Sequence, residues 1–328
     1  MRQNEDALFR IFLKKGAYRL DFEFLQRMNK DLKKASATLT PSECRYLVDS
    51  YYVIQDYRKR AANQIRAMEQ DGEPNELTRW FLSQYELLEN NIKKALDAYT
   101  DSTKLGIWLK SITGIGPVIA AGLIAHIDIE KAPTAGNIWS FAGLNPNMVW
   151  EKGQIRPWNA KLKLLCWKLG ESFIKVRNRE SDIYGKLYWE RKLYEWDRNL
   201  KGELSEQAKT ILKNKKMDKK KDSYLWYSGQ LVPKLIPKAA IADMAEIFRE
   251  NKNHLELCDQ VEEGKGIPML PPGHINERCK RYSVKIFISH LHEYWYWLHY
   301  KEPPPKPFAI AILGHAHKIE PPNMYNVK

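Results

Sequence analysis

The stretch that most constrains this chain is residues 111–125, which read SITGIGPVIAAGLIA. Two glycines flank Ile115, so the backbone can turn tightly there with positive φ and leave the turn amides bare for a phosphate oxygen. Pro117 suits the first position of a helix, where such amides favour an anion. The small Ala121 allows two helices to cross closely. The pattern predicts a helix-hairpin-helix whose turn binds a phosphate; the alternative is a plain tight turn between two core helices.

The charge of the chain favours the phosphate-binding interpretation. Its 328 residues contain 53 Lys plus Arg against 40 Asp plus Glu, a formal net charge of +13, together with 17 Tyr and 11 Trp. Basic charge interleaved with aromatic rings is typical of proteins that bind phosphate backbones and stack on bases. Membrane surfaces and acidic proteins also attract basic chains, so charge alone leaves those partners open.

No pattern for export or membrane insertion is evident. The first residues, MRQNEDALFRIF, carry acids where a signal peptide needs a positive run. The apolar runs are well short of the roughly 20 residues that span a bilayer. Four widely spaced cysteines without a CxxC pair predict reduced thiols in a cytoplasmic protein. These cysteines are Cys44, Cys166, Cys258 and Cys279.

Two heptad-like runs precede the hairpin. The first opens on Thr40-Pro41-Ser42-Glu43, the pattern of a capping box with proline at the first helical position. Apolar spacings of three and four predict an antiparallel coiled-coil hairpin over residues 41–100, with a turn at 71–74. Polar seam residues set register and partner choice, so the hairpin is either a strut or an arm for homo-oligomerisation. The predicted seams are Leu47, Tyr51, Ile54, Arg58, Ala61, Ile65 and Met68, then Leu77, Phe81, Gln84, Leu88, Asn91, Ala95 and Ala98.

Residues 101–200 are predicted to form the helix-hairpin-helix domain. Asp101 or Ser102 would cap its first helix. Thr134 would open a short helix that ends at FAGLNP, where Gly143 suits the position after a helix. A loop at 147–157 and a long basic helix or helix pair from about 158 to 198 follow.

The flanking parts complete a mainly α fold. Residues 1–40 are predicted to hold an N-terminal helical segment. A lysine-rich linker at 201–225 separates the helix-hairpin-helix domain from a second helical domain at 226–328. Within that domain we expect helices at 237–257 and 275–300.

The candidate nucleic-acid contacts combine the turn with the cations of the basic helices. Backbone amides of the turn would hold one phosphate, and the surrounding lysines and arginines would supply counter-charge. The alternative for the cations is a solvated helix face beside a packed aromatic stripe. The predicted contact residues are Thr113, Gly114, Ile115, Gly116, Val118, Arg156, Lys161, Lys163, Lys168, Lys175, Arg177 and Arg179.

We expect no metal or other cofactor. A zinc site through His290, His292, His315 and His317 is the minor alternative. Residues two apart on a helix lie about 200° apart around its axis, so one metal cannot easily take both His290 and His292. The paired carboxylates have ordinary explanations as turns or exposed helix ends.

Three segments resemble the C-terminal domain of the insertion-sequence 110/116/902 transposase family. They are SITGIGPVIAAGLIAHI, FAGLNP and PWNAKLKLLCWKLGESF. The family has a GIGP-type helix-hairpin-helix, a GLxP turn and a basic helix that opens with an N-[KR]-x-[LI]-like run, here residues 159–162. A helical segment before the hairpin also belongs to its layout. The resemblance covers about residues 41–195 and implies binding of DNA, or of structured RNA, in recombination.

Two catalytic elements of that family have no counterpart in the pattern. The family carries a RuvC-like domain with four metal-binding acids, and the 40 residues before the helical region are too few for it. Its nucleophilic serine follows the GLxP turn, where this chain has Trp150, and no serine occurs from Phe141 through Glu171. Cys166, the nearest thiol, lies in an apolar helical stretch. A nucleophilic mechanism needs an alcohol or thiol beside an activating group.

The resemblance therefore implies a transposase-related, basic nucleic-acid-binding protein that is non-catalytic on its own. One alternative is a subunit of an active DNA transposase or recombinase that assembles with a separate catalytic subunit. The other is a helical scaffold or inhibitor that binds an acidic protein.

Overall fold

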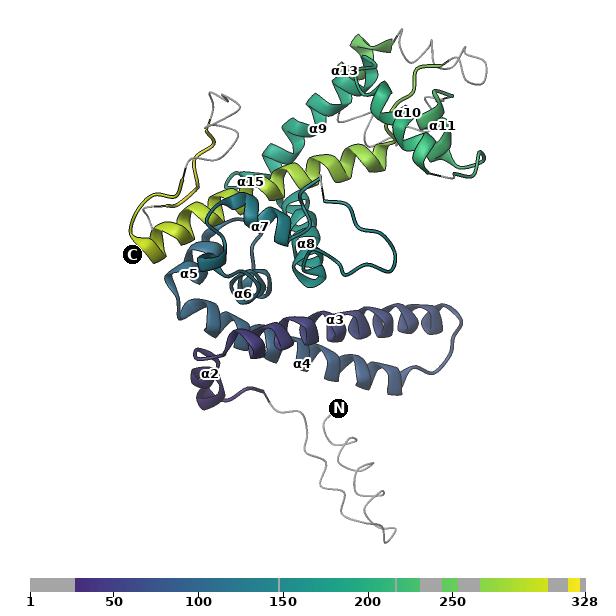
Figure 1. The fold of residues 1–328 in the computed structure, drawn as a ribbon. Coiled ribbons are helices and arrows are strands. Elements are labelled where there is room, and N and C mark those ends of the chain that lie inside the picture. Colours follow the sequence, from purple (N-terminus) through teal and green to yellow (C-terminus); the bar gives the residue numbers. More distant parts are fainter. Residues whose placement is uncertain are drawn as a thin grey trace.

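The computed structural model describes residues 27–146, 148–215, 217–230, 244–252, 266–305 and 318–324. All the regular elements in this part of the chain are helical, and it contains no strand. Two long helices form a lower layer, a group of shorter helices lies against them, and a second long pair extends away from that group (Figure 1). The predicted mainly α fold is confirmed.

The lower layer is a pair of antiparallel helices, α3 (Pro41–Gln70) and α4 (Glu76–Asp101). The predicted capping box is present: the Thr40 hydroxyl accepts from the Glu43 amide at 3.2 Å, and the Glu43 carboxylate accepts from the Thr40 amide at 2.8 Å. Gly72, at φ +70°, lies in the connecting turn. The helical hairpin of residues 41–100 is thus formed as the sequence predicts.

The seam of this hairpin differs from the heptad prediction at its free end. Arg58 forms an ion pair with Glu89 across the two helices, and Gln55 donates to the same carboxylate at 3.2 Å. Leu77 and Phe81, which the heptads place in the seam, are 70% and 43% exposed. Near the other end of the pair, α6 adds a third layer and buries side chains of both helices. None of the described helices covers the pair at its free end, so Leu77 and Phe81 stay in solvent.

The helix-hairpin-helix consists of α5 (Lys104–Ser111) and α6 (Pro117–His126). The N-cap of α5 is Thr103, whose hydroxyl accepts from the Gly106 amide at 3.0 Å. Asp101 and Ser102 were the predicted caps, and that prediction is wrong because α4 continues through Asp101 and ends with Ser102 as its C-cap. The choice among three adjacent capping residues depends on where the preceding helix stops.

Helix α6 is the centre of the molecule. It is apolar along its whole length and packs against α3, α4, α5 and α8 (Ala160–Val176). Small residues permit this crowding, as predicted for Ala121, which is fully buried. A side chain at the next residue, Gly122, would come within 2.7 Å of Leu165 on α8. The start of α6 is thereby held in one place relative to α3 and α8.

The predicted basic helix pair is α8 together with α9 (Tyr184–Leu200). Before it come a 3-10 turn, η1 (Ile129–Lys131), and α7 (Ala135–Phe141). Gly143 follows α7 with φ +65°, as expected for the residue after a helix C-cap.

The predicted C-terminal helix is α15 (Pro272–Tyr300), which packs on α5, α7, α8 and α9. It shares one apolar core with the hairpin region. Trp108 of α5 stacks on Tyr294 of α15 with ring centroids 4.5 Å apart, and Phe173 of α8 meets Phe287 of α15 at 5.7 Å. Helix α15 therefore packs against the helices that hold the α5–α6 hairpin. The predicted domain boundaries stay a prediction.

The outer elements form a second apolar core around Trp196 and Trp226. The lysine-rich segment begins inside a helix of this group rather than in a bare linker, because Ala208 of that helix is buried in this core. The predicted helix at 237–257 falls mostly outside the described residues, as does most of segment 1–40. The remaining described helices are α2 (Lys30–Ser36), α10 (Ser205–Asn214), α11 (Asp222–Ser228) and α13 (Ala245–Glu250).

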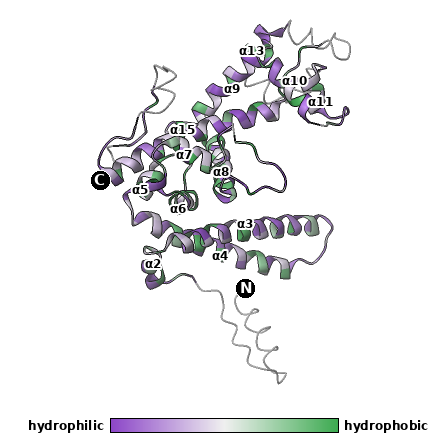
Figure 2. Ribbon diagram, in the orientation of Figure 1, coloured by the Kyte–Doolittle hydropathy of each residue, from purple (hydrophilic) through white to green (hydrophobic). Residues whose placement is uncertain are grey.

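Hydrophobic and hydrophilic residues alternate along the long helices (Figure 2). Among the described residues, none of the helices offers an apolar stretch that could cross a lipid bilayer.

Candidate nucleic-acid interface

The hairpin between α5 and α6 is closed by a hydrogen bond from the Ile115 amide to the Ile112 carbonyl at 3.0 Å. Gly114 has φ +96°, and a side chain on it would lie 3.2 Å from Phe173 and Val176. Gly116 has φ −96° in extended backbone, so the expectation of positive φ holds for Gly114 alone. A side chain on Gly116 would point into open space.

Three amides at the start of α6 are left unpaired. The first helical hydrogen bond runs from the Ala120 amide to the Gly116 carbonyl at 3.0 Å, with Pro117 at the first helical position as predicted. Among the described residues, no acceptor pairs with the amides of Gly116, Val118 and Ile119. Such amides carry the positive end of the helix dipole.

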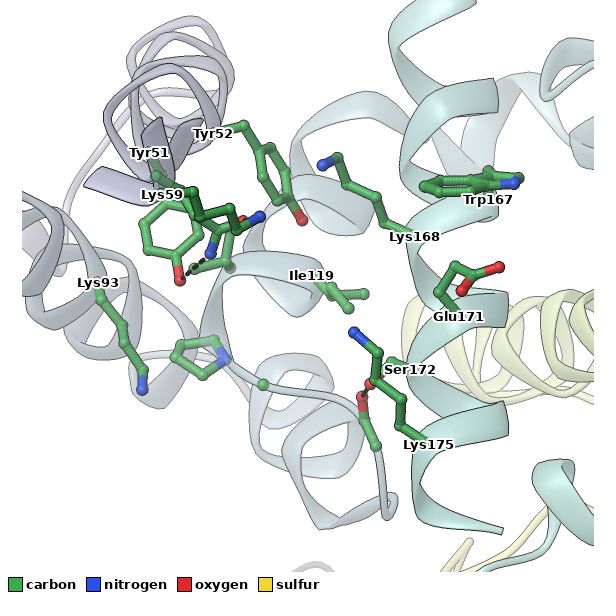
Figure 3. A pocket seen from close by; sticks show the side chains of 15 residues that line it. Tyr51, Tyr52, Lys59, Lys93, Ile119, Trp167, Lys168, Glu171, Ser172 and Lys175 are labelled. Atoms are coloured by element: carbon green, nitrogen blue, oxygen red, sulfur yellow. Dashed lines mark hydrogen bonds between the residues drawn. The ribbon is translucent and has the colours of Figure 1, made fainter. Parts of the chain in front are cut away.

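These residues line a pocket of about 440 Å³ between α3, α4 and α8. Tyr52 and Lys59 come from α3, Lys93 from α4, and Lys168 and Lys175 from α8 (Figure 3). Four lysines thus surround the pocket. Among the described residues that line it, the one carboxylate is that of Glu171, which accepts from the Lys280 ammonium at 2.6 Å.

The ammonium of Lys168 lies 3.8 Å from the centre of the Tyr52 ring. Burial lowers the pKa of Lys168 below its ordinary value, and the nearby charges of Lys59 and Lys175 lower it further, against an opposing effect of Asp56. The pocket therefore holds positive charge at an energetic cost that a bound anion would relieve.

Two hydroxyl contacts fix the turn to the basic helices. The Ser172 hydroxyl donates to the Gly114 carbonyl at 2.5 Å. The Thr113 and Ser181 hydroxyls lie 2.8 Å apart and share a hydrogen bond. The turn amides and the lysines of α8 are consequently held in a fixed arrangement.

The hairpin lies in the one segment of the chain for which a comparison with known proteins found a match. Residues 108–150 match the model of the transposase IS116/IS110/IS902 family. The match runs from the middle of α5 through the hairpin, α6 and α7 to Trp150. It confirms the predicted resemblance for this transposase-family segment, which is shorter than the 41–195 expected. No curated protein and no solved structure matches the chain.

The structure brings five of the predicted contact residues together at the pocket. They are Gly114, Gly116, Val118, Lys168 and Lys175. Ile115 lies between them in sequence, but its side chain is buried, at 5% exposure. The contact roles of all these residues stay predictions.

The other predicted cations point elsewhere. Lys161 pairs with Asp49 of α3 at 3.1 Å, and the Arg177 guanidinium lies 5.2 Å from the centre of the Trp189 ring. Arg179 follows α8 and does not line the pocket. Arg156 and Lys163 lie on a different face, as described further below.

Sequence reasoning missed Tyr52, Lys59 and Lys93. All three lie on the helical hairpin that precedes the transposase-family segment, and the heptad pattern directed attention to the seam instead. The available signal was the basic charge on the other faces of that hairpin, which the sequence alone could not orient toward the turn.

The loop after the GLNP turn carries Trp150, which we predicted to occupy the position of the transposase family's nucleophilic serine. The Trp150 indole donates to the Gln154 carbonyl at 2.8 Å, and the Arg156 guanidinium lies 4.9 Å from the centre of that ring. The nearest thiol, Cys166, is buried, and burial raises its pKa to about 12. A neutral buried thiol is not a nucleophile.

The zinc alternative gains no support from the described residues, which contain no group of three or more His, Cys, Asp or Glu side chains able to hold a metal. His290 and His292 make separate hydrogen bonds, at 2.8 Å, to the carbonyls of Ile319 and Ala132. His315 and His317 lie outside the described residues.

Proposed function

We propose that this chain binds nucleic acid, in a transposase-related role, by holding a backbone phosphate in the pocket at the start of α6. One observation carries the proposal: Gly116, Val118 and Ile119, whose amides have no acceptor among the described residues, line the same pocket as four lysines. Helix N-termini with free amides bind phosphates, and neighbouring cations strengthen that binding.

The proposed ligand is DNA, the substrate class of transposases, and the match of residues 108–150 to a transposase family supports it. The chain's net charge of +13 supports a polyanionic ligand in general. Because a phosphate clamp reads no base, structured RNA is the alternative ligand, and a comparison of DNA and RNA probes of equal length distinguishes them. We assign no catalytic residue; magnesium-dependent strand cleavage by the pure chain would instead indicate an active recombinase.

We further propose that the free end of the α3–α4 pair contacts a second copy of the chain. Leu77, Trp80 and Phe81 are 70%, 52% and 43% exposed there. Tyr57 stacks on Tyr85 across the two helices with ring centroids 5.8 Å apart. A contiguous group of exposed aromatic side chains is typical of a protein interface.

Binding of a DNA duplex at several salt concentrations tests the proposed pocket. Lys168→Gln combined with Lys175→Gln should weaken binding and reduce the slope of log K against log salt by about 1.8, since each phosphate contact contributes about 0.9. The matched control is Lys33→Gln with Lys34→Gln on α2, which removes the same charge from exposed positions that do not line the pocket. Equal slopes for the two double variants would refute the pocket as the binding site.

A further inference from the structure

We call the pocket at the start of α6 the hairpin pocket. A second group of cations lies on the other side of α8 from it. Lys163 comes from α8, Arg156 from the loop before it, and Arg281 and Lys285 from α15. Among the described residues, no acidic side chain forms an ion pair with any of these four. We call these four residues the α15 cluster.

The α15 cluster rests on tryptophan rings. The Lys163 ammonium lies 4.2 Å from the centre of the Trp158 ring, and that of Lys285 lies 4.2 Å from the Trp139 ring. Gly143 makes the first contact possible, because a side chain there would come within 3.0 Å of both Trp158 and Lys163. The GLNP turn therefore positions this basic surface.

The like charges of the α15 cluster repel one another. Burial lowers the pKa of Lys163, and the charges of Arg156 and Arg281 lower it further. Burial and then the charge of Arg281 lower the pKa of Lys285. No carboxylate opposes either effect. Four cations gathered on α8, α15 and the loop before α8 favour a ligand that carries several negative charges, because the nearby carboxylate of Glu277 is paired with Lys280 and not with any of them.

Trp167 connects the α15 cluster to the hairpin pocket. A cavity of about 140 Å³ is lined by Lys163, Trp167 and Arg281, and also by Glu277. Trp167 lines the hairpin pocket as well. Its side chain is 48% exposed, which is high for a tryptophan between two basic sites. The Lys280 ammonium lies 4.8 Å from the ring centre and is fixed by ion pairs with Glu171 and Glu277.

We propose that one unpaired strand of nucleic acid runs from the hairpin pocket across Trp167 to the α15 cluster, with phosphates at both basic sites and a base stacked on the Trp167 ring. The proposal rests on the function proposed above and specifies its ligand further. An exposed indole between two phosphate-binding sites is the arrangement that single-strand binding proteins use, and stacking needs a base that is not paired in a duplex.

The test compares binding of single-stranded and duplex DNA by four variants: two single variants of Trp167, a double variant of the α15 cluster and a double variant that serves as the control. Trp167→Leu should weaken single-strand binding by about 5- to 150-fold, the range that follows from about 1–3 kcal/mol per stacked base. Trp167→Phe keeps a ring and should retain most of the affinity. Duplex binding should change little for either variant.

Arg281→Gln combined with Lys285→Gln should reduce the salt slope of single-strand binding by about 1.4, since each contact to a single strand contributes about 0.7. Lys33→Gln with Lys34→Gln is again the matched control, and circular dichroism checks that each variant folds. Two results would refute the proposed path of the strand, which we call the track. One is a salt slope of the Arg281→Gln and Lys285→Gln variant equal to that of this control. The other is equal single-strand affinity of Trp167→Leu and Trp167→Phe.

The two proposals fail differently. If Lys168→Gln with Lys175→Gln loses binding while the Trp167 and α15 cluster variants do not, the hairpin pocket stands and the track is refuted. If the unmodified chain binds neither form of DNA nor RNA, both are refuted.

Discussion

The Ser172 hydroxyl of α8 donates a 2.5 Å hydrogen bond to the carbonyl of Gly114, at the tip of the hairpin between α5 and α6. This contact joins two segments that are 58 residues apart in the sequence. It places the left-handed turn residue against the helix that supplies Lys168 and Lys175. The phosphate-binding arrangement proposed here therefore depends on tertiary packing as well as on the local GIGP turn.

Removing the hydroxyl in Ser172→Ala should lower the free energy of unfolding by about 1 kcal/mol, because the Gly114 carbonyl loses its donor in a partly buried site. Urea denaturation measures this directly. The control is Ser83→Ala on α4, whose exposed hydroxyl donates to the Trp80 carbonyl and accepts from the Gln84 side chain, both on its own helix. Equal stability of the two variants would contradict a structural role for the Ser172 contact.

The two hairpin glycines should respond differently to alanine. Gly114→Ala places a side chain at φ +96° and within 3.2 Å of two α8 side chains, so we expect a loss of at least about 1 kcal/mol of stability. Gly116→Ala meets no atom within 4 Å and should change stability by less than about 0.5 kcal/mol. Urea denaturation of both variants checks the order; a more damaging Gly116→Ala would contradict the turn geometry.

The stability of the protein should fall as the pH falls from about 6.5 to 4. His290 is buried, at 3% exposure. Its Nε2–H donates to the Ile319 carbonyl, so its Nδ1 accepts from the Tyr184 hydroxyl at 2.8 Å. Burial, reinforced by Lys318 and opposed by the Ile319 contact and Glu320, lowers the pKa of His290 to about 4.

An unfolded histidine titrates near 6.5, so between these values the unfolded state binds one more proton than the folded state. Unfolding is therefore increasingly favoured as the pH drops through this window, by on the order of 3 kcal/mol from His290 in total. Chemical denaturation at a series of pH values should show a shallower dependence for His290→Gln than for the unmodified chain. An unchanged dependence in His290→Gln would refute the assignment.

The free end of the α3–α4 pair should determine the oligomeric state. Trp80→Ser combined with Phe81→Ser removes two exposed aromatic side chains from the proposed contact and should shift the chain to monomer in sedimentation equilibrium. Tyr46→Ser is a suitable control, because Tyr46 is 71% exposed on α3 outside the group of aromatic side chains at the free end. A monomeric unmodified chain would contradict the proposed self-association.

Local sequence signals predicted the elements that local physics determines. The capping box at Thr40 and Glu43 and the left-handed glycines at 114 and 143 were all found where expected. The residue at which a helix begins is harder to predict, because Thr103 and the two residues before it all have side chains that can cap a helix. Only the length of α4 selects Thr103.

Local sequence signals could not predict which residues of α3 and α4 line the hairpin pocket. Lys59 and Lys93 reach it because α3 and α4 pack on α6, and a periodicity of seven describes the contact between those two helices alone. Arg281 joins Lys163 because α15 crosses α8 more than 100 residues later in the chain. Contacts at such separation are set by the shared apolar core, which one sequence does not reveal.

Binding of DNA by Gly116→Val is the direct test of whether bare amides at the start of α6 hold a phosphate. The extended backbone at Gly116 accepts valine, and the surrounding space is open, so the fold should be retained while the side chain blocks the amides. Gly273→Val, at another open position in the first turn of α15, is the matched control. We expect Gly116→Val to bind DNA at least about tenfold more weakly than the control, equivalent to about 1.4 kcal/mol. Affinity equal to that of the control, in a folded protein, would contradict it.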